Sequence, residues 1–156
     1  MYEKRFMKEA IRLAVENVKN GKGGPFGAVV VKEGKIIAAC ANTVTPDLDP
    51  TAHAEVNAIR EACRKLGTYQ LHGCEVYASC EPCPMCLGAI YWARPDKVYY
   101  ACTKKDAAVA GFDDSFIYQE IALPEAERSI PFLNQKEAGS GEEFRLWEES
   151  ESKKKY

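Results

Sequence analysis

The sequence has no apolar run that approaches the ~18 residues needed to cross a membrane. Its first residues, MYEKRFMKEAIRLAVENV, mix charged and apolar side chains throughout, so they lack the uninterrupted apolar core of a signal peptide. We therefore expect a cytoplasmic protein with no membrane partner. The chain of 156 residues suffices for one domain with a sizeable core, and its hydrophobic content of 46% is ordinary for a globular protein.

The sequence also lacks an excess of basic charge. It holds 21 Lys and Arg against 23 Asp and Glu, which gives a net charge of −2. Proteins that bind nucleic acids usually carry a basic footprint. The two short lysine runs, at 104–105 and 153–155, are typical of a solvated surface. We therefore expect no nucleic-acid partner.

Histidine is scarce, whereas cysteine is not: the chain has 2 His and 7 Cys. An odd number of cysteines in a cytoplasmic protein argues against a disulfide framework. Metal binding together with a few buried free thiols accounts for them better. We interpret His72, just before a predicted strand, as an exposed loop residue, which leaves His53 as the histidine to consider as a metal ligand.

Hydrophobic periodicity and turn residues predict the order α, β, β, α, β, α, β, followed by a less regular C-terminal third. This alternation indicates an α/β fold with helices packed on a largely buried mixed sheet. The stretch EAGSGEE at 137–143 resembles a linker, but the piece beyond it is too short for a domain, so we expect a single domain over 1–156. The predicted helices are 3–20, 53–67, a helix from the cysteine turn through 93, 113–123 and 142–150; the strands are 26–32, 35–40, 74–79 and 97–102.

The stretch CEPCPMC, Cys80 to Cys86, is the strongest chemical signal in the chain. Its prolines indicate a tight turn, and the following residues run without a breaker to Pro95, so the thiols lie at the start of a helix. The helix N-terminus favours thiolates. Two cysteines at positions i and i+3 of a first turn can bind one metal ion.

A partner for these thiols begins another predicted helix about thirty residues earlier. His53 opens that helix, and Glu55 follows two residues later. His53, Cys83 and Cys86 would supply three protein ligands to Zn²⁺ and leave a fourth position for a catalytic water. Glu55 would then take the proton of that water and pass it on.

Three other readings of the thiols are weaker. A structural zinc site with Cys80 as a fourth ligand would leave Glu55 without a task. An iron–sulfur cluster would need a cysteine where Ile90 stands. A thiol redox pair would explain neither the prolines nor His53.

The pairing of His53-Ala54-Glu55 with Pro82-Cys83-Pro84-Met85-Cys86 matches the H-x-E…P-C-x-x-C signature of zinc deaminases. The chain therefore resembles the cytidine deaminase-like superfamily, which implies a three-layer αβα sandwich around a mixed five-stranded sheet. Further stretches are similar to bacterial guanine deaminases, namely GGPFGAVVV, DPTAHAEVNAIR, SCEPCPMCLGAIYWAR, AGFDDSFIY and the final Lys-Tyr.

The resemblance implies roles for individual residues. His53, Cys83 and Cys86 look like the zinc ligands, Glu55 like the main proton shuttle, and Asp114 like a second carboxylate that helps to protonate the departing amine. The substrate-binding residues that it implies are Phe26, Asn42, Ala54, Trp92 and Tyr156. From the residues alone, Asn42 can also serve as a turn residue, Asp113 and Asp114 as helix-capping acids, and Phe26 and Trp92 as core; Cys80 has no assigned role.

The resemblance further implies hydrolysis of guanine to xanthine and ammonia with one zinc ion per subunit. It also implies a homodimer in which the C-terminal segment, about residues 135–156, is exchanged between partners so that Tyr156 completes the partner's pocket. Alternatives are a tRNA adenosine deaminase, which should show a basic face, a cytosine or aminotriazine deaminase, and a zinc-stabilised interaction module without catalysis.

Overall fold

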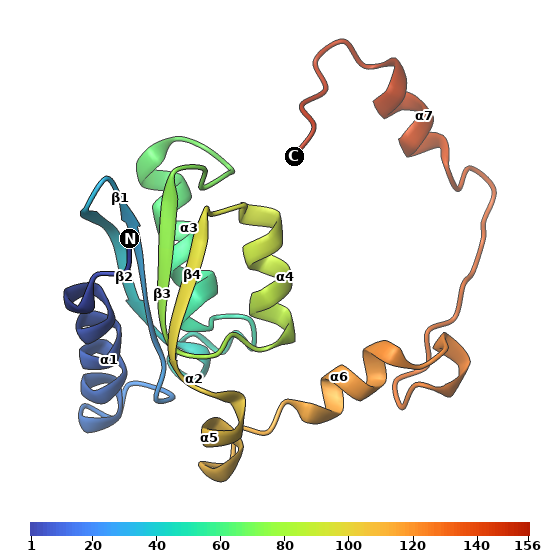
Figure 1. Cartoon of the computed structure of the whole chain (residues 1–156). Coiled ribbons are helices and arrows are strands. Elements are labelled where there is room, and N and C mark those ends of the chain that lie inside the picture. The colour runs from blue at the N-terminus through green and yellow to red at the C-terminus, as the bar shows by residue number, and fades with distance from the viewer. The chain divides into compact units, whose positions relative to one another are not determined.

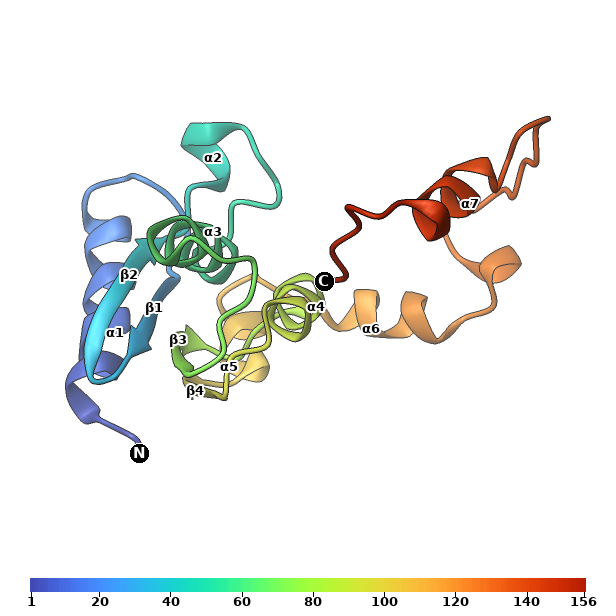
Figure 2. The ribbon, with the colours of Figure 1, turned by 90° about the horizontal axis from the view of Figure 1, so that it is seen from above.

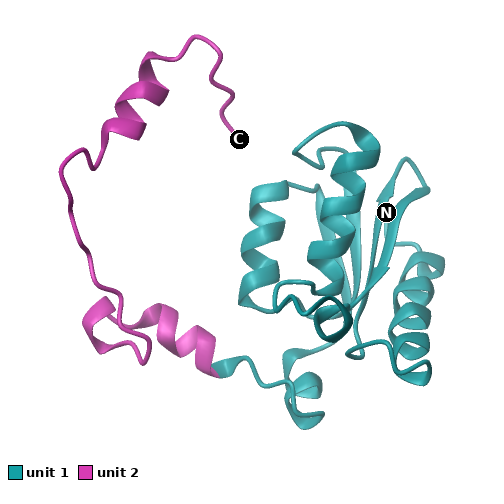
Figure 3. Ribbon diagram, turned by 180° about the vertical axis from the view of Figure 1, so that it is seen from behind, with its two compact units in different colours: residues 1–115 teal, residues 116–156 magenta.

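The computed structural model describes all residues from 1 to 156 and divides them into two compact units, Met1–Ser115 and Phe116–Tyr156 (Figure 3). The first unit contains the helices α1 (Lys4–Lys19), α2 (Val44–Asp47), α3 (Ala54–Leu66), α4 (Pro84–Ala93) and α5 (Lys104–Val109), and the strands β1 (Gly27–Lys32), β2 (Lys35–Ala41), β3 (Cys74–Cys80) and β4 (Lys97–Cys102). The helix α6 (Ser115–Ala122) begins at the boundary; a 3-10 turn (Glu125–Glu127) and α7 (Glu142–Glu149) lie in the second unit. No helix is long and apolar enough to span a membrane.

The first unit has three layers, as the family resemblance implies (Figures 1 and 2). Helix α1 covers one face of the sheet, and α3 and α4 cover the other. Strand β1 contributes side chains to the core on both faces of the sheet. Because successive strand side chains alternate, Ala28 and Val30 pack toward α3, while Val29 and Val31 pack toward Phe6 of α1. Both faces of β1 are therefore apolar, which is why its sequence is a valine run.

The sheet is mixed, with the strand order β2-β1-β3-β4. Strand β1 is antiparallel to β2 and to β3, and β3 is parallel to β4. The expected αβα fold is confirmed, but the sheet has four strands and not five. After β4 the chain turns into α5, whose start is fixed by a capping box between Thr103 and Asp106. The outer edge of β4 therefore has no partner strand within the chain.

Most elements begin and end within two residues of the predicted bounds. Gly67 ends α3 in the left-handed region with φ +64°, as expected of a C-terminal glycine. Two short helices lie where the sequence predicts none: α2 falls in the stretch 42–50, which reads as a loop, and α5 falls in a stretch to which no element was assigned. For α5 the sequence carried a readable signal, since Thr103 followed three residues later by Asp106 is a capping pattern. His72 is exposed, as predicted.

Candidate active site

Helices α3 and α4 pack side by side on one face of the sheet, and both begin at the same end of the strands, where β3 ends (Figure 1). His53 is the N-cap residue of α3, and Cys83 is the N-cap residue of α4. Pro84 occupies the start of α4, where its lack of an N–H costs no hydrogen bond. Cys86 follows in the first turn. Two helix N-termini thus bring their partial positive charge to the same place.

His53, Cys83 and Cys86 present their ligand atoms to one point. The Nδ1 atom of His53 lies 3.5 Å from the Sγ atom of each cysteine. A tetrahedral zinc ion with bonds of about 2.0 Å to nitrogen and about 2.3 Å to sulfur would separate these atoms by about 3.5 Å. The observed spacing is thus that of a zinc site, and a set of one nitrogen and two sulfur atoms is the chemistry that zinc favours.

The electrostatics of the cluster favour the ligand form of Cys83. Hydrogen bonds from Cys86 and then from His53 outweigh the effect of burial and lower the pKa of Cys83 to about 4. These contacts favour the thiolate form of Cys83, and thiolates are the form of cysteine that binds metal.

Glu55 lies on the first turn of α3, only 7% exposed. Burial raises the pKa of its carboxyl group above the ordinary value. A general base works best when its pKa approaches the working pH, so this shift suits a group that must both accept and release a proton. A zinc site that served only to stabilise a fold would give no reason to bury a carboxylate beside it.

Cys80 does not belong to the ligand cluster. Its thiol donates to the backbone oxygen of Thr103 at 3.4 Å, and burial raises its pKa to about 11. The ligand set has three residues, so the reading of Cys80 as a fourth ligand in a closed structural site finds no support.

The comparisons with known proteins agree with this geometry. Residues 1–102 match the family described as the cytidine and deoxycytidylate deaminase zinc-binding region. The chain is 58% identical over 156 residues to the guanine deaminase of Bacillus subtilis, with all of both chains covered. The chain belongs to this zinc deaminase family. The resemblance read from the motifs is thereby confirmed, and so is the expected zinc cofactor.

Two solved structures and a second relative show how similar the chain is to individual members of the family. The crystal structure of the Bacillus subtilis guanine deaminase superposes with a TM-score of 0.97 and covers 100% of this chain and 99% of its own. The guanine deaminase of Nitrosomonas europaea, 34% identical, gives 0.67 and covers 72% of this chain and 65% of its own. A tRNA-specific adenosine deaminase of Aquifex aeolicus is 46% identical over 105 residues, covering 67% of this chain and 69% of its own.

Asn42 follows β2 and presents one defined end of its side-chain amide. Its Oδ1 accepts hydrogen bonds from the backbone N–H groups of Gly24, at 3.4 Å, and Val44, at 3.2 Å. Because both partners are donors, the atom that faces them must be the oxygen. The Nδ2 group makes no hydrogen bond within the chain and therefore remains available as a donor.

The remaining predicted residues occupy different settings. Ala54 is buried at the start of α3, next to His53. Phe26 immediately precedes β1, packs against the core and meets Phe112 edge to face, with ring centroids 5.0 Å apart. Trp92 lies on the outer face of α4 and is 63% exposed. Tyr156 is the last residue of the second unit.

The two aspartates after α5 have different tasks. Asp113 accepts a hydrogen bond from the backbone N–H of Ser115 at 2.9 Å, where α6 begins. Asp114 is half-buried, and burial, followed by the negative charge of Cys83, raises its pKa. The structure thus assigns the helix start to Asp113 and leaves Asp114 within electrostatic reach of the zinc ligands.

The sequence reading missed two asparagines that position the site. Asn57 of α3 donates to the backbone oxygens of Ala41 and Ala52 and to the hydroxyl of Thr43, so it holds both ends of the loop that leads to His53. Asn17, near the end of α1, donates to the backbone oxygens of Gly24 and Asn42. Asparagine is unfavourable in the interior of a helix, so its presence within two predicted helices was the available signal.

Proposed function

We propose that this protein catalyses the zinc-dependent hydrolysis of guanine to xanthine and ammonia. The observation that carries the proposal is the likeness, over the full chain, to the Bacillus subtilis guanine deaminase, with the same fold throughout. The tRNA-specific adenosine deaminases of Aquifex aeolicus and Bacillus subtilis are less similar, at 46% identity over 67% of the chain and 38% identity over 78% of the chain. The net charge of −2 also argues against an RNA substrate.

Glu55 is the proton shuttle of the proposed mechanism. Zinc, when bound, supplies Lewis-acid activation that makes a water nucleophilic at neutral pH. Glu55 accepts a proton from the attacking water and delivers it to ring atom N3, so that C2 becomes electrophilic and bonds to the water oxygen. The burial that raises the pKa of Glu55 makes this proton easier to retain between the two steps.

Asp114 assists the second half of the reaction. The C2–N bond breaks when the exocyclic amine leaves as ammonia, which requires one more proton on that nitrogen. The hydroxyl group on C2 gives up this proton as it becomes the carbonyl of xanthine. The raised pKa of Asp114 supports a role in delivering that proton. Atoms balance, since guanine and one water give xanthine and one ammonia.

Asn42 and aromatic side chains bind the purine in this proposal. The free Nδ2 group of Asn42 donates to an acceptor atom on the edge of the base. Phe26, held against Phe112, forms a wall of the pocket, and Trp92 forms another. The backbone N–H of Ala54 contacts the substrate, and Tyr156 closes the pocket.

The proposed assembly is a homodimer whose partners exchange the C-terminal segment, about residues 135–156. None of the residues from 116 to 156 is buried, although many are large and apolar, and such surfaces usually mark interfaces. Helix α4 likewise exposes Leu87, Tyr91 and Trp92. The exposed apolar residues after α5 include Phe116, Ile121, Ile130, Phe132, Leu133, Phe144, Leu146 and Trp147.

A cytoplasmic location completes the proposal. All seven cysteines are free, which fits a reducing compartment.

The decisive experiment follows the absorbance change from guanine to xanthine and measures bound zinc in the same preparation. We expect turnover with about one zinc per chain, and loss of turnover after chelation. The Glu55→Gln variant should keep its zinc and lose about 10²- to 10⁴-fold in kcat, because only the proton shuttle is removed. Glu61→Gln serves as the control: this half-buried glutamate of the same helix contacts Cys40 and Lys65 and lies outside the ligand cluster, so the variant should turn over normally.

Other outcomes would select another function. Near-normal turnover by Glu55→Gln would overturn the mechanism. Deamination of a tRNA anticodon, of cytosine or of an aminotriazine, with guanine left unchanged, would overturn the substrate while leaving the zinc chemistry in place. Tightly bound zinc without any deamination would indicate a structural module.

A further inference from the structure

Two cysteines outside the zinc cluster lie opposite each other on neighbouring strands. In the parallel pairing of β3 with β4, Cys80 is the partner of Cys102. Neighbouring strands lie about 4.8 Å apart. Disulfide-bonded cysteines have Cα atoms about 4.4 to 6.8 Å apart, so the strand spacing lies within this range. Both side chains also point to the same face, because both line one groove.

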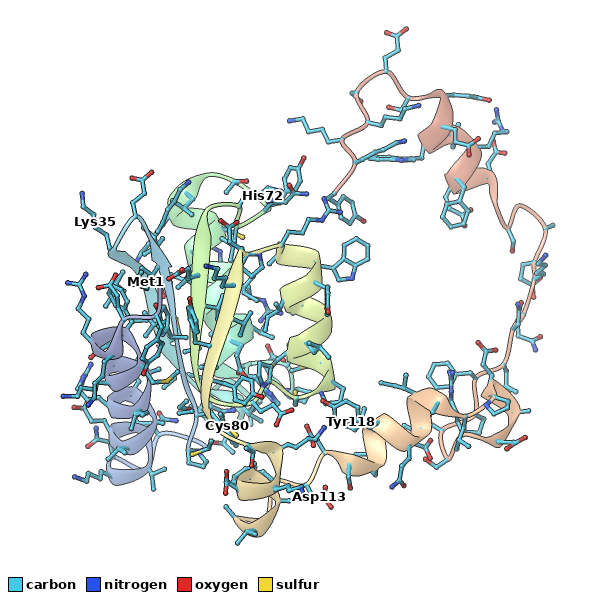
Figure 4. All side chains as sticks on the ribbon, in the orientation of Figure 1. Met1, Lys35, His72, Cys80, Asp113 and Tyr118 are labelled. Carbon is cyan, nitrogen blue, oxygen red and sulfur yellow. The ribbon has the colours of Figure 1, made fainter.

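That groove gives a small molecule access to the pair. It has a volume of about 570 Å³ and runs between α1, the end of the sheet and α5. Figure 4 shows Cys80 at this end of the sheet, beside α5. Cys102 is exposed and Cys80 is 7% exposed, so an oxidant reaches Cys102 first.

The thiol of Cys80 is already oriented toward the strand that carries Cys102. It donates to the backbone oxygen of Thr103, the next residue, at 3.4 Å. The two segments are held in register by hydrogen bonds from the Glu81 N–H to the Cys102 oxygen, at 2.8 Å, and from the Lys104 N–H to Glu81, at 3.0 Å. Little backbone movement is therefore needed to join the sulfur atoms.

We propose that Cys80 and Cys102 form a reversible cross-strand disulfide when the enzyme meets a peroxide. The Cys102 thiol reduces hydrogen peroxide and becomes a sulfenic acid, with release of one water. The Cys80 thiol then displaces hydroxide from that sulfur; the S–S bond forms and a second water leaves. The two thiols supply both electrons and both protons, and a dithiol reverses the bond by exchange.

The bond would enclose α4 and the two candidate zinc ligands Cys83 and Cys86 in a covalent loop, because they lie between Cys80 and Cys102 in the chain. Such a loop constrains the unfolded state and raises the unfolding midpoint. It leaves the ligand cluster itself unchanged, since Cys80 is not one of the ligands. The inference does not depend on which base the enzyme deaminates.

The test exposes the zinc-loaded, full-length enzyme to a small excess of hydrogen peroxide and digests it under conditions that prevent disulfide exchange. We expect a peptide pair joined through Cys80 and Cys102, lighter by two hydrogen atoms, together with retained zinc and a higher unfolding midpoint. Dithiothreitol should restore both original peptides.

Two variants make the result specific. In Cys102→Ser, an exposed and mild change, Cys80 should remain reduced and the unfolding midpoint should not rise after the same treatment. Cys63→Ser removes a thiol on α3 that lies outside the groove, and should form the link as the wild type does. Sulfinic acid at Cys102 without a joined peptide would overturn the proposal, as would a link from Cys80 to Cys83 accompanied by zinc release.

Discussion

At the scale of single residues, the site depends on which atom each polar side chain presents. Two backbone donors hold Oδ1 of Asn42, and Asn17 holds its backbone oxygen, so the Nδ2 donor has a defined direction. A donor that is oriented before the substrate arrives loses little freedom on binding. This orientation selects a base that presents a hydrogen-bond acceptor to the Nδ2 group of Asn42.

The Asn42→Asp variant tests the orientation directly. Aspartate keeps an oxygen for Gly24 and Val44 but replaces the donor with a second acceptor, so the fold should be preserved while the hydrogen bond to the base is lost. We expect kcat/KM for guanine to fall about 10- to 100-fold. Steady-state kinetics and the unfolding midpoint check this, and an unchanged kcat/KM would show that Asn42 only shapes its loop.

At the scale of elements, the sheet sets where the site forms. Strand β1 lies against α1 so closely that there is no room for a side chain at Gly27. A Cβ atom there would lie 2.2 Å from the backbone oxygen of Ala10 and 2.9 Å from the backbone nitrogen of Ala14. This close approach aligns the start of β1, and with it Phe26, against the end of the sheet at which the site forms.

The Gly27→Ala variant should therefore destabilise the protein, because a backbone segment of α1 must move to admit one methyl group. We expect the free energy of unfolding of the zinc-loaded protein to fall by about 1–3 kcal/mol. Gly24→Ala is the matched control: its nearest neighbours would be 3.4 Å away, so it should change stability by about 0.5 kcal/mol or less. Urea denaturation measures both, and equal values for the two variants would contradict the packing argument.

At the scale of the whole molecule, the chain leaves apolar surface without a cover. The outer edge of β4 is unpaired, α4 exposes an apolar face, and the second unit buries none of its side chains. Exposed edges and apolar helices promote association. The proposed exchange of residues 135–156 between two copies would cover part of this apolar surface.

Mixing two inactive variants tests that exchange with full-length chains. Tyr156→Ala removes the residue that closes the pocket, and Glu55→Gln removes the proton shuttle. If Tyr156 acts on the partner subunit, a mixed dimer contains one complete site, and random pairing should recover about one quarter of the wild-type activity. If Tyr156 acts within its own chain, co-refolded mixtures stay as inactive as the separate variants, as measured by guanine turnover.

The sequence by itself determined the element order, because periodicity marks each helix and strand locally. The pairing of His53 with Cys83 and Cys86, which lie 30 and 33 residues later, was recognised through the H-x-E…P-C-x-x-C motif and not through any local pattern. The family resemblance implied a five-stranded sheet, whereas the sheet of this chain has four strands. Helix α5 was missed, although its capping pattern is present in the sequence.

Only the tertiary structure decided which residues share a neighbourhood across long stretches of chain. Asn17 and Asn42, or Cys80 and Cys102, are far apart in sequence, and no periodicity relates them. The packing of α1 on the sheet brings Asn17 to Asn42, and the register of β3 with β4 brings Cys80 to Cys102. The orientation of the Asn42 amide and the exclusion of Cys80 from the zinc site follow from those contacts, because hydrogen-bond partners are set by position in space and not by order in the chain.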